Sequence, residues 1–494
     1  MVLASSKSTL PLSDTPQLTY DHSPSNISTL CNEVLKDHAI KHSSDPAECF
    51  LKSSTKHSPA GEHHTPTTVF YPTTTAEVSS IAKACHERNI AITSFGGGTS
   101  LGGALTATRG GVCIDFRNMD RILGVHDEDM DVVVQPNVGW VELNEWLEGK
   151  GLFFPPDPAP GAKIGGMISM GCSGTNAYRY GTMKDWVISL TLVLADGTVL
   201  KTRNRPRKSS AGYDLTSLIV GSEGTLALVT EAVLKVATLP VNLHVGLACF
   251  AELQTAVNVV GKVLKSGLQL EAIELADKPS IHAINQSGLG EEPLLEHPTL
   301  FLKFAGGQEI VRAQTQFVEE LCKQHSAQSV EVSADKGRIN VIWGARKCLG
   351  NALVAMKKSE SDLFLHTDAA VPVSRMAKLV EESIRIVEGS GSGKRRGWFC
   401  ANVGHVGDGN VHTAIICPKE DKDAAEQLLS QVQRLALELE GTITGEHGVG
   451  LKLRDLLVKE VGQEGVDMMR RIKIALDPKG ILNPDKVVRL SANI

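Results

Sequence analysis

The stretch Phe154-Pro-Pro-Asp-Pro-Ala-Pro-Gly-Ala-Lys-Ile-Gly-Gly-Met-Ile-Ser-Met-Gly-Cys-Ser-Gly-Thr-Asn-Ala-Tyr-Arg-Tyr-Gly181 decides the fold of this chain. Its prolines forbid helix and fix an extended backbone. The glycines that follow are separated mainly by small or hydroxylated residues, so the backbone can lie directly against a flat or phosphorylated ligand. By composition alone an ordinary glycine-rich surface loop fits equally well, and a second stretch of the same character favours the ligand.

That second stretch, Phe95-Gly-Gly-Gly-Thr-Ser-Leu-Gly-Gly103, follows an apolar strand predicted over Ile90 to Phe95. A helix is predicted before it, from about Thr75 to Arg88, because apolar residues recur on one face and Thr74 and Glu77 stand at capping-box spacing. A strand, a glycine loop and a nearby helix suit a pyrophosphate. The spacing GxGxxxG misses the strict dinucleotide fingerprint, so a nicotinamide fold is not favoured.

Together with Val220-Gly-Ser-Glu-Gly-Thr-Leu226, these stretches resemble the flavin-binding domain of the vanillyl-alcohol oxidase/PCMH superfamily. The rest of the chain is similar to its D-2-hydroxy-acid dehydrogenase branch, which includes D-lactate and D-2-hydroxyglutarate dehydrogenases and the glycolate oxidase flavin subunit. The resemblance covers about Thr67 to Val487. It implies an α+β fold with four parts: an N-terminal tail and short helix (1–66), a two-subdomain PCMH-type FAD-binding domain (67–240), an antiparallel-sheet cap domain with the substrate and metal sites (241–420), and a C-terminal helical segment that returns to the flavin domain (421–494).

Several local expectations accompany this division. Residues 1 to 25 read as a disordered tail, and a short helix is predicted to start near Ser28. Leu190 to Leu200 is predicted as a hairpin with a type I′ turn at Asp196-Gly197. After Pro240 the alternation of helices and strands predicts an antiparallel sheet with helices on one face.

The resemblance implies that the first glycine loop holds the FAD pyrophosphate and that the second stretch wraps the rest of the cofactor. Neither loop contains histidine, so we expect the FAD to be non-covalent, with Cys172 as the one candidate tether. The expected FAD-binding residues are Gly96, Gly97, Gly98, Thr99, Ser100, Leu101, Pro156, Asp157, Gly165, Gly166, Cys172, Ser173, Gly174, Asn176, Tyr180, Gly181, Glu223, Gly224, Val229 and Asn483.

Composition narrows the partners and the compartment. The chain has 494 residues and a net charge of −6, which argues against nucleic acid as a partner, and no apolar run approaches the roughly 20 residues of a membrane span. Ten scattered cysteines without a CxxC pair suit reduced thiols inside a cell. The N-terminus lacks the arginines of a transit peptide. The resemblance implies mitochondria, and a cytoplasmic location is the alternative.

The sharpest local signal is Gly404-His-Val-Gly-Asp-Gly-Asn-Val-His412. A two-residue turn at Asp408-Gly409 would place His405 directly opposite His412, with Cβ atoms roughly 5 Å apart. Two imidazoles so placed can share a metal ion, or they can simply face solvent. The resemblance favours the metal and implies Glu446 as the third ligand, and this ligand set suits zinc or manganese without choosing between them.

Two further residues are candidates for catalysis. His447 follows Glu446, and adjacent side chains diverge in extended backbone, so we expect it to be a general base rather than a ligand. A buried structural histidine is the alternative. The resemblance assigns Arg346, in Ile342-Trp-Gly-Ala-Arg346, to the substrate carboxylate, which a guanidinium fits bidentately. From the sequence alone, an arginine on an amphipathic helix is usually solvated.

The resemblance implies metal-assisted oxidation of a D-2-hydroxy acid, with D-lactate favoured. Electrons would pass from the FAD to cytochrome c or another acceptor, and a homodimer is compatible with the sequence. D-2-hydroxyglutarate dehydrogenase and the glycolate oxidase flavin subunit are alternatives, although Lys347 stands where the glutarate enzymes tend to have glutamate. Gly102 stands where D-lactate enzymes often carry an acidic residue. Two other functional classes are a metallohydrolase and a non-catalytic flavin-binding subunit. A hydrolase leaves both glycine stretches unexplained.

Overall fold

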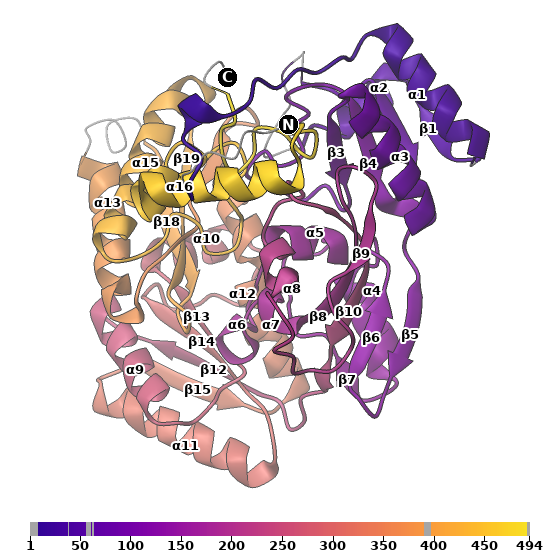
Figure 1. Ribbon diagram of the computed structural model, residues 1–494. Helices are drawn as coiled ribbons and strands as arrows, with labels where there is room; N and C mark the ends of the chain where they lie inside the picture. The colour runs from indigo at the N-terminus through magenta and orange to yellow at the C-terminus, as the bar shows by residue number, and fades with distance from the viewer. Residues whose placement is uncertain (1–7, 38, 56–60, 62–63, 390–396, 492–494) are drawn as a thin grey trace. The chain divides into compact units, whose positions relative to one another are not determined.

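Figure 1 shows a computed structural model of the chain, which describes residues 8–37, 39–55, 61, 64–389 and 397–491. The chain divides into two compact units. Unit 1 comprises Met1–Ser173, Thr182–Leu239 and Glu446–Ile494, and unit 2 comprises Gly174–Gly181 and Pro240–Gly445. Across the described ranges, no helix combines the length and the apolar character that a membrane span requires.

The first half of unit 1 is a four-stranded sheet covered by helices. Its strands lie in the order β1 (Lys41–Ser43), β2 (Thr68–Tyr71), β4 (Val112–Asp115) and β3 (Ile92–Phe95). The last three are parallel, and β1 is antiparallel to β2. Helices α1 (Pro24–Asp37) and α3 (Thr75–Arg88) contribute Leu30 and Ile81 to the same apolar cluster as Phe70. The predicted capping box at Thr74 and Glu77 is confirmed, and it fixes where α3 begins.

The second half of unit 1 is an antiparallel sheet. Its order is β5 (Ile122–His126), β6 (Asp131–Val134), β10 (Leu228–Lys235), β8 (Val187–Val193) and β9 (Val199–Lys201), and β7 (Leu152–Phe153) pairs separately with β11 (Ala237–Thr238). Helices α4 (Trp140–Glu148) and α5 (Ile164–Met170) pack into the core of this half.

The hairpin predicted over Leu190 to Leu200 forms between β8 and β9, but its turn is not of type I′. The Gly197 N–H donates to Leu194 O at 3.0 Å, and Gly197 has φ +86° whereas Asp196 does not have a positive φ. A type I′ turn needs positive φ at both central residues. Asp196 Oδ1 instead accepts the Thr198 N–H at 2.9 Å, a local bond that suits the ordinary right-handed conformation.

The N-terminal segment from residue 8 onward is joined to unit 1. Leu10 is buried and its N–H donates to Asp467 O in α16 (Leu457–Leu476), while the Tyr20 hydroxyl donates to Gly480 O. The prediction of a disordered tail is therefore wrong for residues 8–25, because Leu10 enters an apolar cluster that polar composition did not reveal and α1 already begins at Pro24. Residues 1–7 lie outside the described ranges.

Unit 2 is built on one antiparallel sheet. Its order is β15 (Ser329–Ser333), β12 (His244–Cys249), β14 (Thr299–Phe304), β13 (Ala272–Ala276), β18 (Phe399–His405), β19 (Asn410–Cys417) and β16 (Leu363–His366), and β17 (Ala369–Ala370) also pairs with β19.

Helices cover both faces of this sheet, so the prediction of helices on one face is wrong. One apolar cluster joins the sheet to α9 (Leu253–Lys265), α11 (Gln308–Gln324), α13 (Met376–Gly389) and α15 (Lys422–Glu438), and another joins it to α10 (Lys278–Ser287) and α12 (Lys336–Ala355). Successive residues of a strand face opposite sides, and in β12 Leu247 lies in the second cluster while Ala248 lies in the first. Both faces of β12 are thus apolar, which is the pattern of a strand buried on both sides.

Candidate active site

The two histidines of the β18–β19 hairpin share one face of the sheet of unit 2, in a register other than the predicted one. His405 pairs with Asn410, and Val403 pairs with His412. The turn is wider because the N–H groups of Asp408 and Gly409 both lie 3.1 Å from His405 O, so the direct pairing of His405 with His412 is wrong. His405 and Val403 are two residues apart, so His412 still projects on the same side as His405. The ring centroids are 5.6 Å apart and the ring planes meet at 88°.

A buried carboxylate, Glu274 on β13, connects His405 with Arg346. The His405 Nδ1 atom lies 2.9 and 2.8 Å from the two carboxylate oxygens. Arg346 donates from Nε at 3.1 Å and from Nη2 at 2.6 Å to Oε2. The Glu274 side chain is fully buried and the Arg346 side chain is 12% exposed. A carboxylate on Nδ1 fixes the tautomer of the imidazole and leaves Nε2 as the atom that can ligate a metal.

The sequence prediction missed Glu274. The available signal was a lone glutamate within the otherwise apolar run Ala272–Ala276, where a charge needs a partner. Arg346, predicted to bind the substrate carboxylate, is already engaged by this protein carboxylate through two of its nitrogens.

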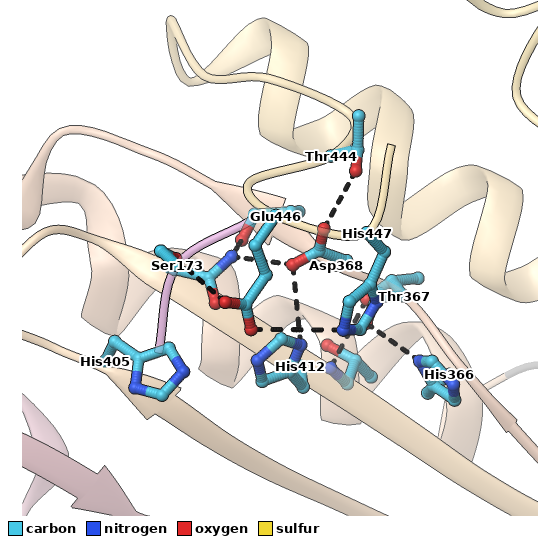
Figure 2. A network of polar contacts seen from close by, with 12 residues as sticks. Ser173, His366, Thr367, Asp368, His405, His412, Thr444, Glu446 and His447 are labelled. Atoms are coloured by element: carbon cyan, nitrogen blue, oxygen red, sulfur yellow. Dashed lines mark hydrogen bonds and ion pairs between the residues drawn. The ribbon is translucent and has the colours of Figure 1, made fainter. Parts of the chain in front are cut away.

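A second carboxylate, Asp368, lies beside His412. The His412 Nδ1 atom is 3.5 Å from Asp368 Oδ1, to which Asn410 donates at 2.8 Å. Thr444 donates to Oδ2 at 2.8 Å, and the Gly445 N–H donates to the backbone oxygen of Asp368 at 2.7 Å (Figure 2). Asp368 therefore fixes the backbone at the end of unit 2, one residue before Glu446.

Glu446 and His447 belong to unit 1. Ser173 Oγ donates to Glu446 Oε2 at 2.8 Å, and His447 Nε2 lies 3.9 Å from Glu446 Oε1 (Figure 2). The expectation that these adjacent side chains diverge is wrong, because the backbone bends at residues 445–447 instead of running extended.

The glycine stretches come together in unit 1. A Cβ on Gly97 would lie 2.3 Å from Gly161 O, and a Cβ on Gly165 would lie 2.6 Å from the Cβ of Pro136. Backbone therefore packs on backbone here, which only glycine permits. In the first loop the Ser100 Oγ atom is buried and receives no hydrogen bond from any described residue.

Two family models match this chain. Residues 66–203 match an FAD binding domain, and residues 239–487 match the C-terminal domain of FAD linked oxidases. The chain belongs to the FAD-linked oxidases. The two matches together cover the glycine stretches, Arg346, the hairpin histidines and the segment of Glu446 and His447.

Curated relatives align with most of this FAD-linked oxidase. The chain is 42% identical over 435 residues to the mitochondrial D-lactate dehydrogenase [cytochrome] of Kluyveromyces lactis, covering 87% of the chain and 74% of the relative. It is 39% identical over 500 residues to the mitochondrial D-lactate dehydrogenase [cytochrome] 1 of Saccharomyces cerevisiae, covering 98% and 84%. It is 34% identical over 427 residues to the glycolate oxidase subunit GlcD of Bacillus subtilis, covering 85% and 89%.

Solved structures share the fold. p-Cresol methylhydroxylase matches with a TM-score of 0.77 at 14% identity, covering 97% of the chain and 100% of that structure. Alkyldihydroxyacetonephosphate synthase matches with a TM-score of 0.72 at 19% identity, covering 96% and 87%. The predicted α+β fold with a PCMH-type FAD-binding domain is thereby confirmed.

The first glycine loop of this FAD-linked oxidase fits an FAD. Its backbone is free of Cβ atoms at Gly96, Gly97 and Gly98, the last with φ +71°, and Ser100 offers a buried hydroxyl without a hydrogen-bond partner among the described residues. Such a loop can surround a pyrophosphate with N–H and O–H donors.

The remaining expected FAD residues are divided between the units. Unit 2 contains Gly174, Asn176, Tyr180 and Gly181, and unit 1 contains the rest. The Tyr180 hydroxyl donates to Glu271 Oε2 at 2.9 Å, and the Val229 side chain packs in the core of the second sheet of unit 1. Burial raises the pKa of the Cys172 thiol, which keeps it in the unreactive protonated form.

Proposed function

We propose that this FAD-linked oxidase oxidises D-lactate to pyruvate. The names of the relatives from Kluyveromyces lactis and Saccharomyces cerevisiae support the substrate. The observation that carries the proposal is the single buried carboxylate of Glu274, which joins the proposed substrate-binding guanidinium of Arg346 to the imidazole of His405. A 2-hydroxy acid has a carboxylate and a hydroxyl on adjacent carbons, so a cation and a metal ligand held near each other suit it.

We propose His405, His412 and Glu446 as ligands of a divalent metal, zinc or manganese. His405 and His412 project from the same face of the sheet, and Glu274 and Asp368 approach their Nδ1 atoms. Carboxylates behind ligating imidazoles are usual at metal sites, since they fix the ring and raise its basicity. Glu446 follows Gly445 in the chain, and the Gly445 N–H donates to the backbone oxygen of Asp368. A metal so bound would polarise the substrate hydroxyl as a Lewis acid.

Each protein group then has a distinct task. Arg346 binds the substrate carboxylate with the guanidinium N–H groups that do not engage Glu274, and Glu274 keeps that guanidinium in place. His447 takes the hydroxyl proton as general base. When bound, FAD would supply the acceptor for the Cα hydrogen and its electron pair as the alcohol is oxidised to a 2-oxo acid.

We further propose a mitochondrial location and a cytochrome as electron acceptor, on the names of the same relatives. Glycolate is the second candidate substrate, because the glycolate oxidase subunit of Bacillus subtilis aligns over a similar share of the chain. Both acids carry the same carboxylate and hydroxyl, and they differ by one methyl group.

One experiment separates these functions. The purified protein is made anaerobic, and its flavin absorbance near 450 nm is followed after addition of D-lactate, L-lactate, glycolate or D-2-hydroxyglutarate in turn. We expect D-lactate to bleach the band fastest and L-lactate to leave it unchanged. If glycolate or D-2-hydroxyglutarate bleached the band faster, that acid would replace D-lactate as the proposed substrate. A yellow protein that none of the four acids reduces would overturn the oxidation of these acids altogether, and a colourless protein would favour a hydrolase.

A further inference from the structure

Glu223, expected from the sequence to bind the cofactor, lies in a tightly fixed turn of unit 1. It follows α8 (Leu215–Ile219), has φ +54° and is 4% exposed. Its N–H donates to Ser169 O at 2.8 Å, and its backbone oxygen accepts Asn483 Nδ2 at 2.7 Å. A left-handed conformation is unusual for glutamate, so the surrounding contacts must hold it.

The carboxylate of Glu223 is used by the backbone that follows His447. Val449 N–H donates to Oε1 at 2.6 Å. Gly450 N–H donates to Oε1 at 3.1 Å and to Oε2 at 2.8 Å. Gly448 has φ +79°, and a Cβ there would lie 2.8 Å from Oε1, so Gly448 also lies against the carboxylate. Both oxygens thus accept hydrogen bonds from protein N–H groups.

The same segment is fixed on its other side by the first glycine loop. Leu451 N–H donates to Gly102 O at 2.8 Å, and a Cβ on Gly450 would lie 2.2 Å from that oxygen. Asn483 completes the connection, because its Nδ2 donates both to Glu223 O and to Ala104 O, just beyond the loop. Residues 448–451 therefore link the carboxylate of Glu223 to the loop that fits the FAD.

Burying the carboxylate of Glu223 in this way costs free energy. Among the described residues no basic side chain forms an ion pair with Glu223. Burial raises its pKa to about 7, although the N–H groups of Val449 and Gly450 and the charge of Lys486 oppose the rise. Buried acids without an ion-pair partner are rare and persist where their hydrogen bonds hold something in place.

We propose that Glu223 is a positioning residue for the catalytic segment, and that its carboxylate does not bind the cofactor. By holding the N–H groups of Val449 and Gly450, it sets the place of Glu446 and His447, which precede them by two to four residues. This inference rests on the proposed function for the roles of Glu446 and His447. A displacement of about 1 Å in such groups can slow a reaction about 10²-fold.

The test compares three variants of the FAD-loaded protein. Glu223→Ala removes both acceptors. Glu223→Gln keeps one acceptor and places an NH₂ group where the carboxylate accepted a second bond. Glu231→Gln is the matched control, since the side chain of this glutamate of β10 accepts one long hydrogen bond from the described part of the chain, from Thr191 at 3.3 Å. The readouts are flavin content, hydrogen exchange of the peptide spanning residues 446–453, and the anaerobic rate of flavin reduction by D-lactate.

We expect both Glu223 variants to retain a full equivalent of FAD, to exchange the Val449 and Gly450 amides faster, and to reduce the flavin about 10 to 10² times more slowly. The control should match the wild type in all three. If Glu223→Gln loses FAD while the hydrogen exchange of the peptide is unchanged, Glu223 binds the cofactor and the inference is wrong. If Glu223→Ala does not fold, Glu223→Gln carries the same test.

The two proposals fail differently. If D-lactate does not reduce the wild-type flavin, the proposed function fails, and the exchange measurement still decides whether Glu223 holds residues 449–450. If D-lactate reduces the wild type and the Glu223 variants equally fast, the positioning role is wrong and the function stands.

Discussion

The Nδ1 atom of His405 lies 2.8 Å from Oε2 of Glu274, the same carboxylate oxygen to which Arg346 donates twice. Glu274 comes from the middle of the sheet, His405 from the end of β18 and Arg346 from helix α12. The carboxylate of Glu274 therefore neutralises the charge of Arg346 and also orients the imidazole of His405. Breaking such a buried network leaves the remaining groups unpaired, which costs more than the lost bonds alone.

We expect Glu274→Gln to impair two properties together. The neutral amide no longer compensates the charge of Arg346. Its NH₂ group also repels a donor whose hydrogen bond the carboxylate accepted. Metal affinity should fall about 10 to 10²-fold, the usual effect of removing a carboxylate behind a ligating histidine, and the KM for D-lactate should rise. Metal content by mass spectrometry and steady-state kinetics measure the two effects. Glu296→Gln is the matched control, because Glu296 contacts His282 Nδ1 at 3.0 Å in the same manner at an exposed position. Equal metal content and KM in both variants would show that Glu274 has only a structural role.

We expect the FAD to be held without a covalent bond. The first loop contains no histidine or cysteine, and the burial that raises the pKa of Cys172 disfavours its thiolate. Acid precipitation should release all yellow colour into the supernatant. Colour that remains in the pellet would contradict this, and its absence from the pellet of Cys172→Ala would identify the bond.

The sequence predicted regular elements well and side-chain partners poorly. The helix Thr75–Arg88 has the predicted bounds, because a capping box and the apolar spacing mark it locally. The register of the β18–β19 hairpin was wrong, because the width of its turn depends on N–H bonds to His405 O that no local pattern encodes.

The partners of the candidate site were missed for a related reason. Glu274 precedes His405 by 131 residues and Glu223 precedes Gly450 by 227 residues, so only the folded backbone joins them. A buried acid in an apolar strand signals that a partner exists but not which residue it is. Arg346 was recognisable as a member of a motif, whereas its pairing with Glu274 was not.

We expect chelation to abolish turnover while the FAD stays bound, since the proposed ligands lie outside both glycine stretches. Activity should return on addition of Mn²⁺ or Zn²⁺, and the ion that restores it fully identifies the physiological metal. His405→Ala and His412→Ala should each lose metal, whereas His282→Ala, at a partly exposed position on α10, should not. A full metal equivalent and full rate in either hairpin variant would exclude that histidine as a ligand.

Because Lys486 is buried, we expect the free energy of unfolding to depend on pH. This lysine is 2% exposed and donates to Thr106 O, and burial lowers its pKa from 10.5 to about 7. Between these values the unfolded chain holds a proton that the folded chain has lost, so stability rises with pH in this window. Lys486→Met lacks this group. The stability of the wild type relative to the variant should therefore rise from pH 7 to pH 9.5, by at most about 1.4 kcal/mol per pH unit. Urea unfolding at several pH values measures the difference, and a constant difference would show that Lys486 stays charged in the folded protein.

The closest test of the mechanism separates Glu446 from His447. If Glu446 holds the metal, Glu446→Gln should lose metal affinity, because a neutral amide is a poorer ligand of a divalent cation. If His447 takes the proton, His447→Asn should keep both metal and FAD and still bind the 2-oxo acid product. Its flavin reduction should slow by roughly 10²–10⁴-fold, the usual scale of general-base catalysis. The short distance between the two side chains, 3.9 Å from His447 Nε2 to Glu446 Oε1, makes this separation necessary, since either residue could in principle serve either role.

The measurement is anaerobic stopped-flow reduction by D-lactate, which does not involve the electron acceptor. A protonated imidazole cannot accept a proton, so the wild-type rate should fall towards acidic pH, and His447→Asn should lack that fall. Thr444→Val is a control for the segment, because it removes the hydrogen bond to Asp368 without changing a proposed ligand or base. A His447→Asn protein that reduces its flavin near the wild-type rate would remove His447 from the proton transfer. Loss of metal from His447→Asn, with metal retained by Glu446→Gln, would exchange the two roles.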